Sequence, residues 1–374
     1  MSDIRNMLVE TANKILKDFC SKESIMEAEK GIWPVELWNV LEETGMTLAG
    51  ISEEAGGVGG DVGDALSLLK IAGRYAAPIP LAETIIANWL LGASGKTVYT
   101  EAVTVGPVRM DDSLNFTKVS EGWVVFGELR DIPWARDVKE IVLFGKTEDG
   151  NKIVTSTPLE NCQIRKGTNL AGEPRDEVIL NNILIPNENV SINPPVSETD
   201  YWNLSTLTRV SMMAGALEKV LEISVDYANE RSQFGRSIGK FQAVKQQLAV
   251  MAGEVAASSA AADSALAAFC RGTIVHETSM AKIQVGEAAA LVTKIAHQVH
   301  GAMGFTDEHP LHLSTRRLWS WRDEYGTESH WAELLGGSVL ENGSETLWNM
   351  ITSSFITEKI NLKRFFKMER DYDD

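Results

Sequence analysis

The stretch YANERSQFGRSIGKFQAVKQQLA, residues 227–249, is the part of the sequence that decides the fold. It joins two long, Ala-rich stretches, 201–230 and 240–271, whose apolar residues recur at helical spacing. A third amphipathic stretch covers 279–300, and a last helix is expected from about 328 to 362. The C-terminal domain, 197–374, is therefore predicted to be a four-helix bundle.

The residues before this bundle divide into two parts of different composition. Helical spacing dominates 1–95, where Pro34 suits the first position of a helix and Gly45 suits the position just past its end. From 96 to 196 the chain has short segments rich in Val, Ile and Thr, bounded by Gly, Asp or Asn. The predicted fold class is α+β: an N-terminal helical domain (1–95), a small antiparallel β domain (96–196) and the bundle. Strands and helices do not alternate, so a Rossmann sheet is not expected.

Charge and composition exclude several classes of protein. The 374 residues include 35 basic and 52 acidic side chains, a net charge of −17. Nucleic-acid and anionic-membrane binding both need a positive field, so neither is expected. The sequence shows no signal segment and no apolar run of membrane-spanning length, which predicts a cytoplasmic protein. The three cysteines are scattered and odd in number, so a disulfide framework or zinc finger is not expected.

Three further segments contain motif-like patterns. They are SEEAGGVGG (52–60), EVILNNILIPNENV (177–190) and QVHGAMGFTDEHPLHLSTRRLWSWRDEYGT (298–327). Together with 227–249, they resemble the acyl-CoA dehydrogenase family, in the order of its three domains and over essentially the whole chain. RYAAPIPLAET and RRLWSWRDE are similar to a divergent branch that oxidises ring-acyl and steroid side-chain thioesters, in which some members are heteromeric.

The resemblance implies α,β-dehydrogenation of an acyl-CoA thioester. FAD is the implied cofactor, shared between the β domain, the helical core and a neighbouring subunit. A base removes the proton beside the thioester carbonyl, and a hydride passes from the next carbon to the flavin. An electron-transfer flavoprotein is the implied acceptor, and the implied assembly is a tetramer, a dimer of dimers, with itself or with a second such chain.

Several positions match family residues that contact FAD. The resemblance places Arg231 at the pyrophosphate of the adjacent subunit's FAD, where a planar guanidinium suits two phosphate oxygens. Thr327 matches a threonine near the flavin; an N-cap of the last helix is the competing interpretation, and both roles are compatible. The other implied contacts to the ADP half are Gln233, Phe234, Gln242, Gln298 and Gly301.

The catalytic base is where the sequence departs from the family. Its usual source is the glutamate of a Tyr-Glu-Gly-Thr loop, but here Glu324 and Tyr325 are in inverted order. Tyr325 therefore occupies the base position, and a tyrosine with a pKa of about 10 is a poor base near neutral pH. Glu324 is the remaining candidate, provided that the loop shifts. A second branch takes its base from the first bundle helix, just before an arginine, and that position is Thr208.

The flavin-binding motifs of the β domain are also missing. Instead of a Thr-Glu-Pro cradle the sequence has TEAVTVGPVRMDDS, and Asp131 to Trp134 replace a flavin-stacking segment. We therefore hypothesise that this chain completes the FAD site of a partner that supplies the base. The alternatives are a self-sufficient dehydrogenase using Glu324, a non-catalytic scaffold subunit, and a flavoenzyme of the same fold with other chemistry, such as a monooxygenase or desulfinase.

Two other patterns suggest sites but have simpler explanations. The glycine-rich 52–60 segment follows no strand and lacks a Lys-Ser/Thr pair, so a tight connection is favoured over a phosphate loop. The pairs His297/His300 and His309/His312 lie near carboxylates, but their spacings match no known ligand pattern. No metal site is therefore predicted.

Overall fold

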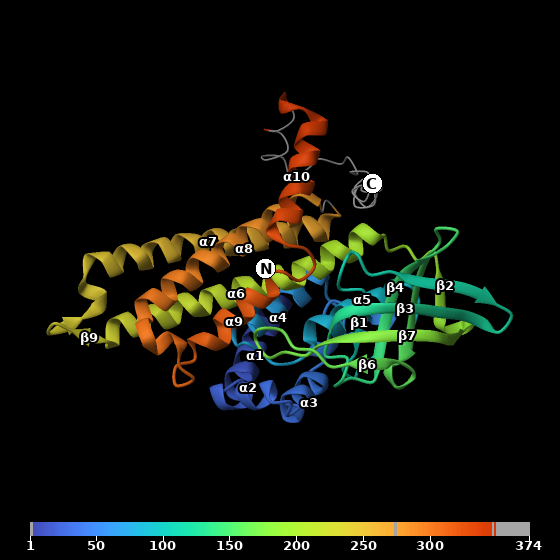
Figure 1. Cartoon of the computed structure of the whole chain (residues 1–374), viewed down its shortest axis with the longest axis horizontal. Coiled ribbons are helices and arrows are strands. Elements are labelled where there is room, and N and C mark those ends of the chain that lie inside the picture. The colour runs from blue at the N-terminus through green and yellow to red at the C-terminus, as the bar shows by residue number, and fades with distance from the viewer. Residues whose placement is uncertain (1–2, 273–274, 346–347, 349–374) are drawn as a thin grey trace.

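A computed structural model describes residues 3–272, 275–345 and 348. It has three parts: a group of N-terminal helices, a sheet domain and a bundle of long helices, with the sheet and the far tip of the bundle at opposite ends (Figure 1). The predicted α+β class is thus confirmed, and the sheet domain is built as expected from short strands between 104 and 192.

The N-terminal helices are α1 (Asp3–Phe19), α2 (Lys22–Glu29), α3 (Val35–Glu43), α4 (Val62–Arg74) and α5 (Leu81–Ala93). Gly45 follows α3 in the left-handed conformation, with φ of 71°, as its place after the helix predicts. Pro34 lies one residue before the first helical position, as the N-cap. The 52–60 segment is a short 3-10 turn and a loop, and α4 then begins with a capping box formed by Asp61 and Asp64.

The β domain is one sheet in the order β6-β7-β3-β2-β4-β5-β8, with β1 paired to β4. Most of its strand pairs are antiparallel as expected, but β1 and β2 each run parallel to β4. Its strands are β1 (Thr104–Gly106), β2 (Leu114–Val119), β3 (Gly122–Pro133), β4 (Glu140–Thr147), β5 (Lys152–Pro158), β6 (Gln163–Arg165), β7 (Arg175–Pro186) and β8 (Val190–Ile192).

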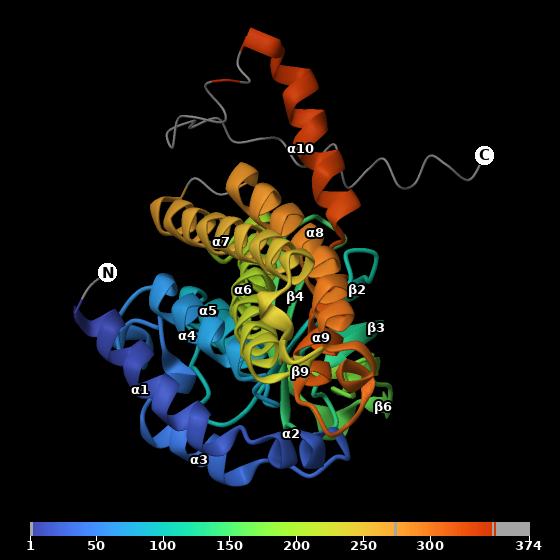
Figure 2. The ribbon, with the colours of Figure 1, turned by 90° about the vertical axis from the view of Figure 1, so that its left-hand side faces the viewer.

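The bundle contains α6 (Glu198–Glu230), α7 (Gln242–Arg271), α8 (Val275–His300) and α10 (Glu328–Asn342). The first three lie side by side, whereas α10 packs on α8 and rises away from the body (Figures 1 and 2). The helix expected over 328–362 is therefore present to Asn342, and its predicted continuation lies outside the described residues apart from 343–345 and 348. A shorter helix not foreseen from the sequence, α9 (Leu311–Trp321), precedes α10.

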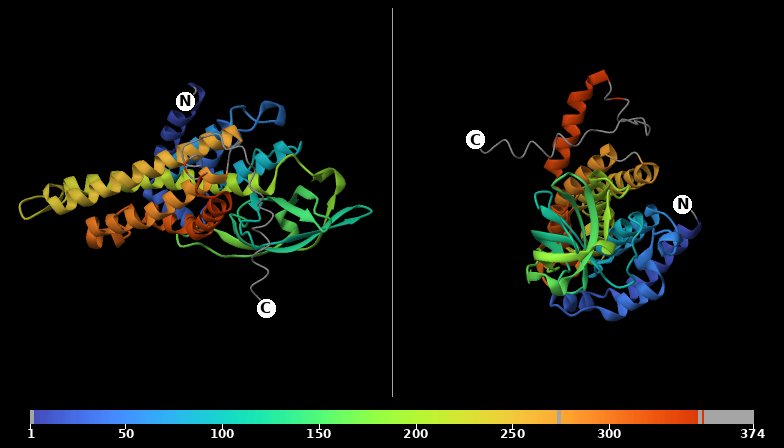
Figure 3. Two further views of the ribbon diagram at one scale, coloured as in Figure 1. Left: turned by 90° about the horizontal axis from the view of Figure 1, so that it is seen from above. Right: turned by 90° about the vertical axis from the view of Figure 1, so that its right-hand side faces the viewer.

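Two glycines let the N-terminal domain approach the bundle closely. A Cβ on Gly73 of α4 would lie 2.0 Å from the carbonyl oxygen of Met212, and one on Gly215 of α6 would lie 1.8 Å from that of Lys70. Only glycine permits this separation of the two backbones. The close crossing holds the first half of α6, most of it buried, against the N-terminal helices (Figure 3). At the start of α6, Tyr201 stacks on Phe144 of β4 in the sheet.

Candidate functional site

A pocket of about 1050 Å³ opens where the β domain meets the loop between α9 and α10. The β domain contributes the turn after β1, the end of β3 and the loop before β7, and the bundle contributes residues 320–330. The lining residues are 108–113, Asp131, Thr168, Asn169, Arg175, Ser320, Asp323 to Thr327 and His330. Glu324, Tyr325 and Thr327, which the sequence singled out, therefore border one cavity.

Tyr325 adopts the left-handed conformation, with φ of 55°, and its side chain is almost fully buried. Its ring packs edge-on against Trp202 at 6.2 Å, and the Arg209 guanidinium lies 5.3 Å from the ring centre. Burial raises the pKa of its hydroxyl well above the usual value. Within the described part of the chain that hydroxyl has no hydrogen-bond partner. A buried phenol of raised pKa cannot accept a proton near neutral pH.

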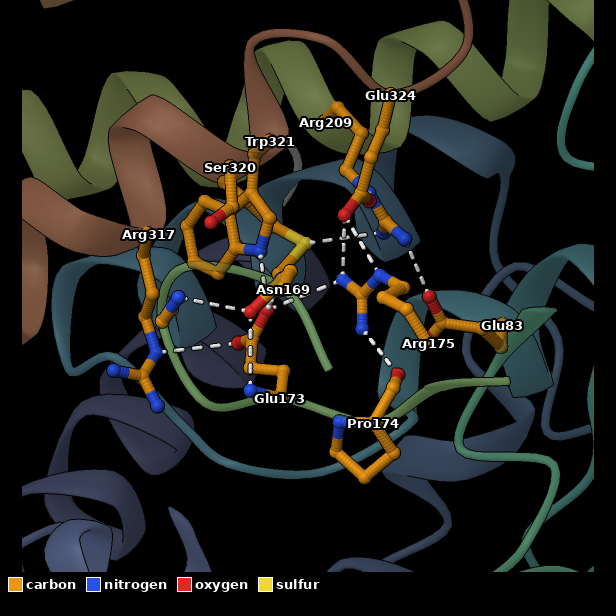
Figure 4. A network of polar contacts seen from close by, with 12 residues as sticks. Glu83, Asn169, Glu173, Pro174, Arg175, Arg209, Arg317, Ser320, Trp321 and Glu324 are labelled. Carbon is orange, nitrogen blue, oxygen red and sulfur yellow. Dashed lines mark hydrogen bonds and ion pairs between the residues drawn. The ribbon is translucent and has the colours of Figure 1, made fainter. Parts of the chain in front are cut away.

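The carboxylate of Glu324 is held by two arginines (Figure 4). Arg175 Nε donates to it at 2.8 Å and Arg209 Nε at 2.5 Å. Burial alone would raise the pKa of Glu324, but these two cations hold it below its usual value. A carboxylate stabilised in its charged form is a weak base. This geometry therefore disfavours the hypothesis that the chain is a self-sufficient dehydrogenase in which Glu324 abstracts the proton.

The ion pairs extend on both sides of Glu324 across all three domains (Figure 4). On one side Arg209 pairs with Glu83 of α5 at 2.5 Å. On the other, Arg175 pairs with Glu173 at 3.1 Å, and Arg317 pairs with Glu173 at 3.2 Å and with Glu29 of α2 at 3.0 Å. We call Glu29, Glu83, Glu173, Arg175, Arg209, Arg317 and Glu324 the buried ion chain.

Lys282 of α8 holds the main chain of the same loop. Its buried ammonium donates to the carbonyl oxygens of Trp321 at 3.1 Å and Glu324 at 2.9 Å, and burial lowers its pKa to about 8. The carbonyl oxygen of Tyr325 accepts from Thr206 Oγ1 and Trp331 Nε1. The loop is therefore fixed through both its side chains and its backbone.

The residue at the second base position of the family, Thr208, also has a structural role. Thr208 is fully buried in α6, and its hydroxyl donates to the carbonyl oxygen of Ser205 at 2.6 Å. Thr327 accepts from the backbone N–H of His330 and caps α10, the interpretation that competed with a flavin contact.

The β-domain wall of the pocket is acidic, and negative charge there disfavours the phosphates of FAD. Asp111, Asp112 and Asp131 line it, and Arg109 and Arg130 are already engaged by these carboxylates. This wall therefore offers a pyrophosphate no uncommitted cation and several like charges. The pocket residues of this chain therefore do not fit an FAD held by this chain alone.

The positions assigned to the ADP half come from elements whose ends meet at the tip of the bundle, the end of the molecule opposite the sheet (Figure 1). Arg231, Gln233 and Phe234 lie on or beside the hairpin of β9 (Ser232–Gln233) and β10 (Arg236–Ser237), and all are exposed, Phe234 by 92%. Gln242 begins α7, and Gln298 and Gly301 lie at the end of α8. Tyr227 connects the two groups. Its backbone carbonyl oxygen accepts from the N–H of Arg231, and its hydroxyl donates to the carbonyl oxygen of His300.

The exposed tip suits a ligand held mostly by another molecule. Its guanidinium and amide groups can donate to phosphate and ribose oxygens, and Phe234 can stack on a base. The sequence did not reveal the roles of Glu83, Glu173, Arg175 and Lys282. Most buried cations have no signature in a single sequence. Arg209 is an exception, because an arginine within an otherwise apolar and small-residue helical stretch indicates a buried, paired charge.

Two general features concern metals and membranes. Within residues 3–272, 275–345 and 348, no group of three or more His, Cys, Asp or Glu side chains is placed to hold a metal ion. Among those same residues, no helix is both long and apolar enough to cross a membrane. All three cysteines are free thiols.

Helices, a sheet domain and a bundle in this order define the fold of the acyl-CoA dehydrogenases, FAD-dependent oxidoreductases that act on CH–CH bonds. Residues 202–330 match the family model described as acyl-CoA dehydrogenase, C-terminal domain. The resemblance to the acyl-CoA dehydrogenase family that the sequence indicated is therefore confirmed.

Curated relatives agree along most of the chain. It is 28% identical to acyl-CoA dehydrogenase IpdE2 of Mycolicibacterium smegmatis over 85% of this chain and 93% of that protein. It is 26% identical to acyl-CoA dehydrogenase FadE27 of Mycobacterium tuberculosis over 74% of this chain and 80% of that protein.

Among solved structures, the ChsE4–ChsE5 complex of Mycobacterium tuberculosis matches with a TM-score of 0.84. The identity is 20%, over 92% of this chain and 99% of the other. The Tcur3481–Tcur3483 steroid ACAD matches with a TM-score of 0.83 at 20% identity, over 91% and 98% of the two chains. At this identity the likeness establishes the fold alone.

Proposed function

We propose that this chain is one subunit of a heteromeric acyl-CoA dehydrogenase and that a partner of the same fold supplies the base and the flavin-binding wall. The observation that carries the proposal is the state of the two base positions. Tyr325 is buried as a core residue, Thr208 is bonded to its own helix, and the adjacent Glu324 is neutralised by Arg175 and Arg209.

In this proposal the chain acts through its tip. Arg231 binds the pyrophosphate of an FAD seated in the partner, Gln233 and Gln242 contact its ribose and adenine, and Phe234 covers the base. Gln298 and Gly301 approach the same ADP half, since Tyr227 ties that turn to the hairpin. When bound in the partner's site, FAD would accept the hydride from the β-carbon of the acyl-CoA.

Two of the structural neighbours support a two-chain assembly by their names: the first is described as the ChsE4–ChsE5 complex, and the name of the second joins Tcur3481 with Tcur3483. The second is described as a steroid enzyme. We extend both features to this chain: its substrate class is an acyl-CoA thioester with a bulky ring, and its assembly is a heterotetramer that passes electrons to an electron-transfer flavoprotein.

A non-catalytic scaffold is the competing proposal. The buried ion chain favours it, because a site locked by seven charged side chains is stable without any ligand. The two proposals differ in one expectation: if the chain contributes to the FAD site, removing the charge of Arg231 weakens FAD binding by the complex, and if the chain is a scaffold, it does not.

The test measures flavin absorbance near 450 nm on the chain alone and on its complex with a partner dehydrogenase chain. We expect no FAD on the isolated chain and one FAD for each pair of chains in the complex. Arg231→Gln should weaken FAD binding by the complex about 10- to 100-fold, because a charged hydrogen bond to phosphate contributes about 1.5–3 kcal/mol. Lys245→Gln, an exposed change on α7, is the matched control and should leave binding unchanged.

Two results would contradict the proposal. One FAD on every chain, with oxidation of acyl-CoA by this chain alone, would show a complete site. Normal FAD affinity of the Arg231→Gln complex would instead support the scaffold.

A further inference from the structure

Four of the six histidines of the chain gather at the tip of the bundle. His297 and His300 end α8, His309 precedes α9 and His312 lies in its first turn. The rings of His300 and His309 are 4.6 Å apart, and Tyr227 of α6 stacks on His300 at 4.4 Å. We call these four residues the histidine cluster.

The hydrogen bonds of the cluster suit neutral rings. His300 Nδ1 donates to the carbonyl oxygen of Ala296, and His312 Nδ1 donates to that of His309. Each therefore keeps a bare Nε2, buried and without a hydrogen-bond partner among the described residues. A proton added to His300 Nε2 would create a buried N–H with no acceptor, which is costly.

His309 is also unsuited to a positive charge. Its Nδ1 accepts from the backbone N–H of Leu311, the first residue of α9, and protonation of that atom would break this bond. A cation at a helix N-terminus is moreover repelled by the helix dipole. His297 lies between Phe305 at 4.3 Å and Trp319 at 5.5 Å, and its Nε2 shares a hydrogen bond with Thr315.

The charged groups facing the cluster do not offset added protons. Lys22 of α2 donates to the carbonyl oxygens of Asp307 and Glu308, which brings a cation to the same loop. The Asp307 carboxylate lies 4.0 Å from His312 Nε2, but it is largely exposed, so solvent weakens that pair. Tyr227 from α6 and Thr315 from α9 contribute only neutral hydroxyls.

We propose that the histidine cluster is an acid-sensitive latch: while its rings are neutral it holds the turn 298–309 against the end of α6, and when they take up protons it releases that turn. Burial lowers the pKa of His297, His300 and His309, in the last case to about 4. Because these pKa values lie below the value of an unfolded histidine, 6.5, the stabilisation is complete above about pH 6.5 and falls as the pH decreases.

The latch would act on nucleotide binding through Tyr227, which joins the turn to Arg231. That consequence rests on the proposed function, whereas the latch itself is a property of the chain alone. A test on the isolated chain therefore separates the two: a failed latch leaves the FAD proposal standing, and a failed FAD proposal leaves the latch standing.

Hydrogen–deuterium exchange of the full chain at about pH 7.5 and pH 5 tests the latch, with rates corrected for the intrinsic pH dependence of exchange. We expect protection of peptides within 298–309 to fall at least about tenfold at the lower pH, since each proton taken up on opening contributes up to tenfold per pH unit. The double variant His300→Phe, His309→Phe keeps the stacked rings but not the titration, and it should retain its protection. His276→Phe, at the other end of α8, is the matched control and should behave like the unchanged chain.

Two results would overturn the latch. One is that residues 298–309 of the unchanged chain are as well protected at pH 5 as at pH 7.5. The other is that the double variant loses as much protection at pH 5 as the unchanged chain. If the double variant fails to fold, histidine ring NMR on the unchanged chain decides the matter. His309 should then titrate near pH 4 and His300 below the usual value of about 6.5, and normal titrations near 6.5 for both rings would refute the proposal.

Discussion

Replacing Glu324 with glutamine separates a structural role from a catalytic one. The side chain is one-tenth exposed and accepts from both Arg175 and Arg209. Removing one partner of a buried ion pair costs about 3–5 kcal/mol, because the remaining charge is left uncompensated. Glutamine keeps the volume and one acceptor oxygen, and both arginines retain Glu173 or Glu83. We therefore expect Glu324→Gln to lower the free energy of unfolding by about 3 kcal/mol, at the lower end of that range.

The assay is urea unfolding of the chain at neutral pH, followed by tryptophan fluorescence and by circular dichroism. Asp323→Asn is the matched control, since Asp323 is the exposed neighbour in the same loop, and it should change the free energy by less than about 0.5 kcal/mol. The pH dependence has a definite sign: with its pKa lowered, Glu324 contributes stability above its unfolded pKa, 4.5, and loses it as the pH falls. A fully stable variant that has lost acyl-CoA turnover would refute the reasoning and identify Glu324 as the base.

Two more changes test the same loop. Tyr325→Phe should leave stability within about 1 kcal/mol or raise it, because it removes only an unpartnered buried hydroxyl, whereas Tyr325→Ala should cost about 3–5 kcal/mol through the cavity it opens; equal losses in urea unfolding would contradict the packing role. Lys282→Met removes two hydrogen bonds to carbonyl oxygens, and it should also abolish a gain of stability that the unchanged chain shows as the pH rises from about 8 to 10.5. That gain follows because the unfolded lysine still binds a proton in this range and the folded one does not, and an identical pH profile for both proteins would exclude it.

The fold was largely readable from the sequence because its signals are local. Helical periodicity located α6, α7 and α8, and Gly45 marked the end of a helix through a conformation that few other residues adopt. The start of the 96–196 region was less clear: among its Val- and Thr-rich residues up to 108, the structure forms a strand over Thr104–Gly106. Its neighbours in space, rather than its own composition, decide the pairing.

The candidate site was only partly readable, because its chemistry depends on contacts between distant residues. The inverted order of Glu324 and Tyr325 predicted that the usual base is missing, and the structure adds that one side chain is buried and the other is paired with arginines. Arg175 is separated from Glu324 by 149 residues, and no pattern in the sequence relates them. The placement of the predicted FAD contacts at the tip remains a prediction from the resemblance until binding is measured.

The buried ion chain also constrains how the protein can be made in the cell. Arg209 and Arg175 precede Glu324 by 115 and 149 residues. At a translation rate of about 5–20 residues per second, they leave the ribosome roughly 6–30 seconds before the carboxylate that neutralises them. During that interval Arg209 has Glu83 and Arg175 has Glu173, but neither has the carboxylate of Glu324 that they share. The junction of the three domains should therefore reach its final packing only after the loop that contains Glu324 has left the ribosome.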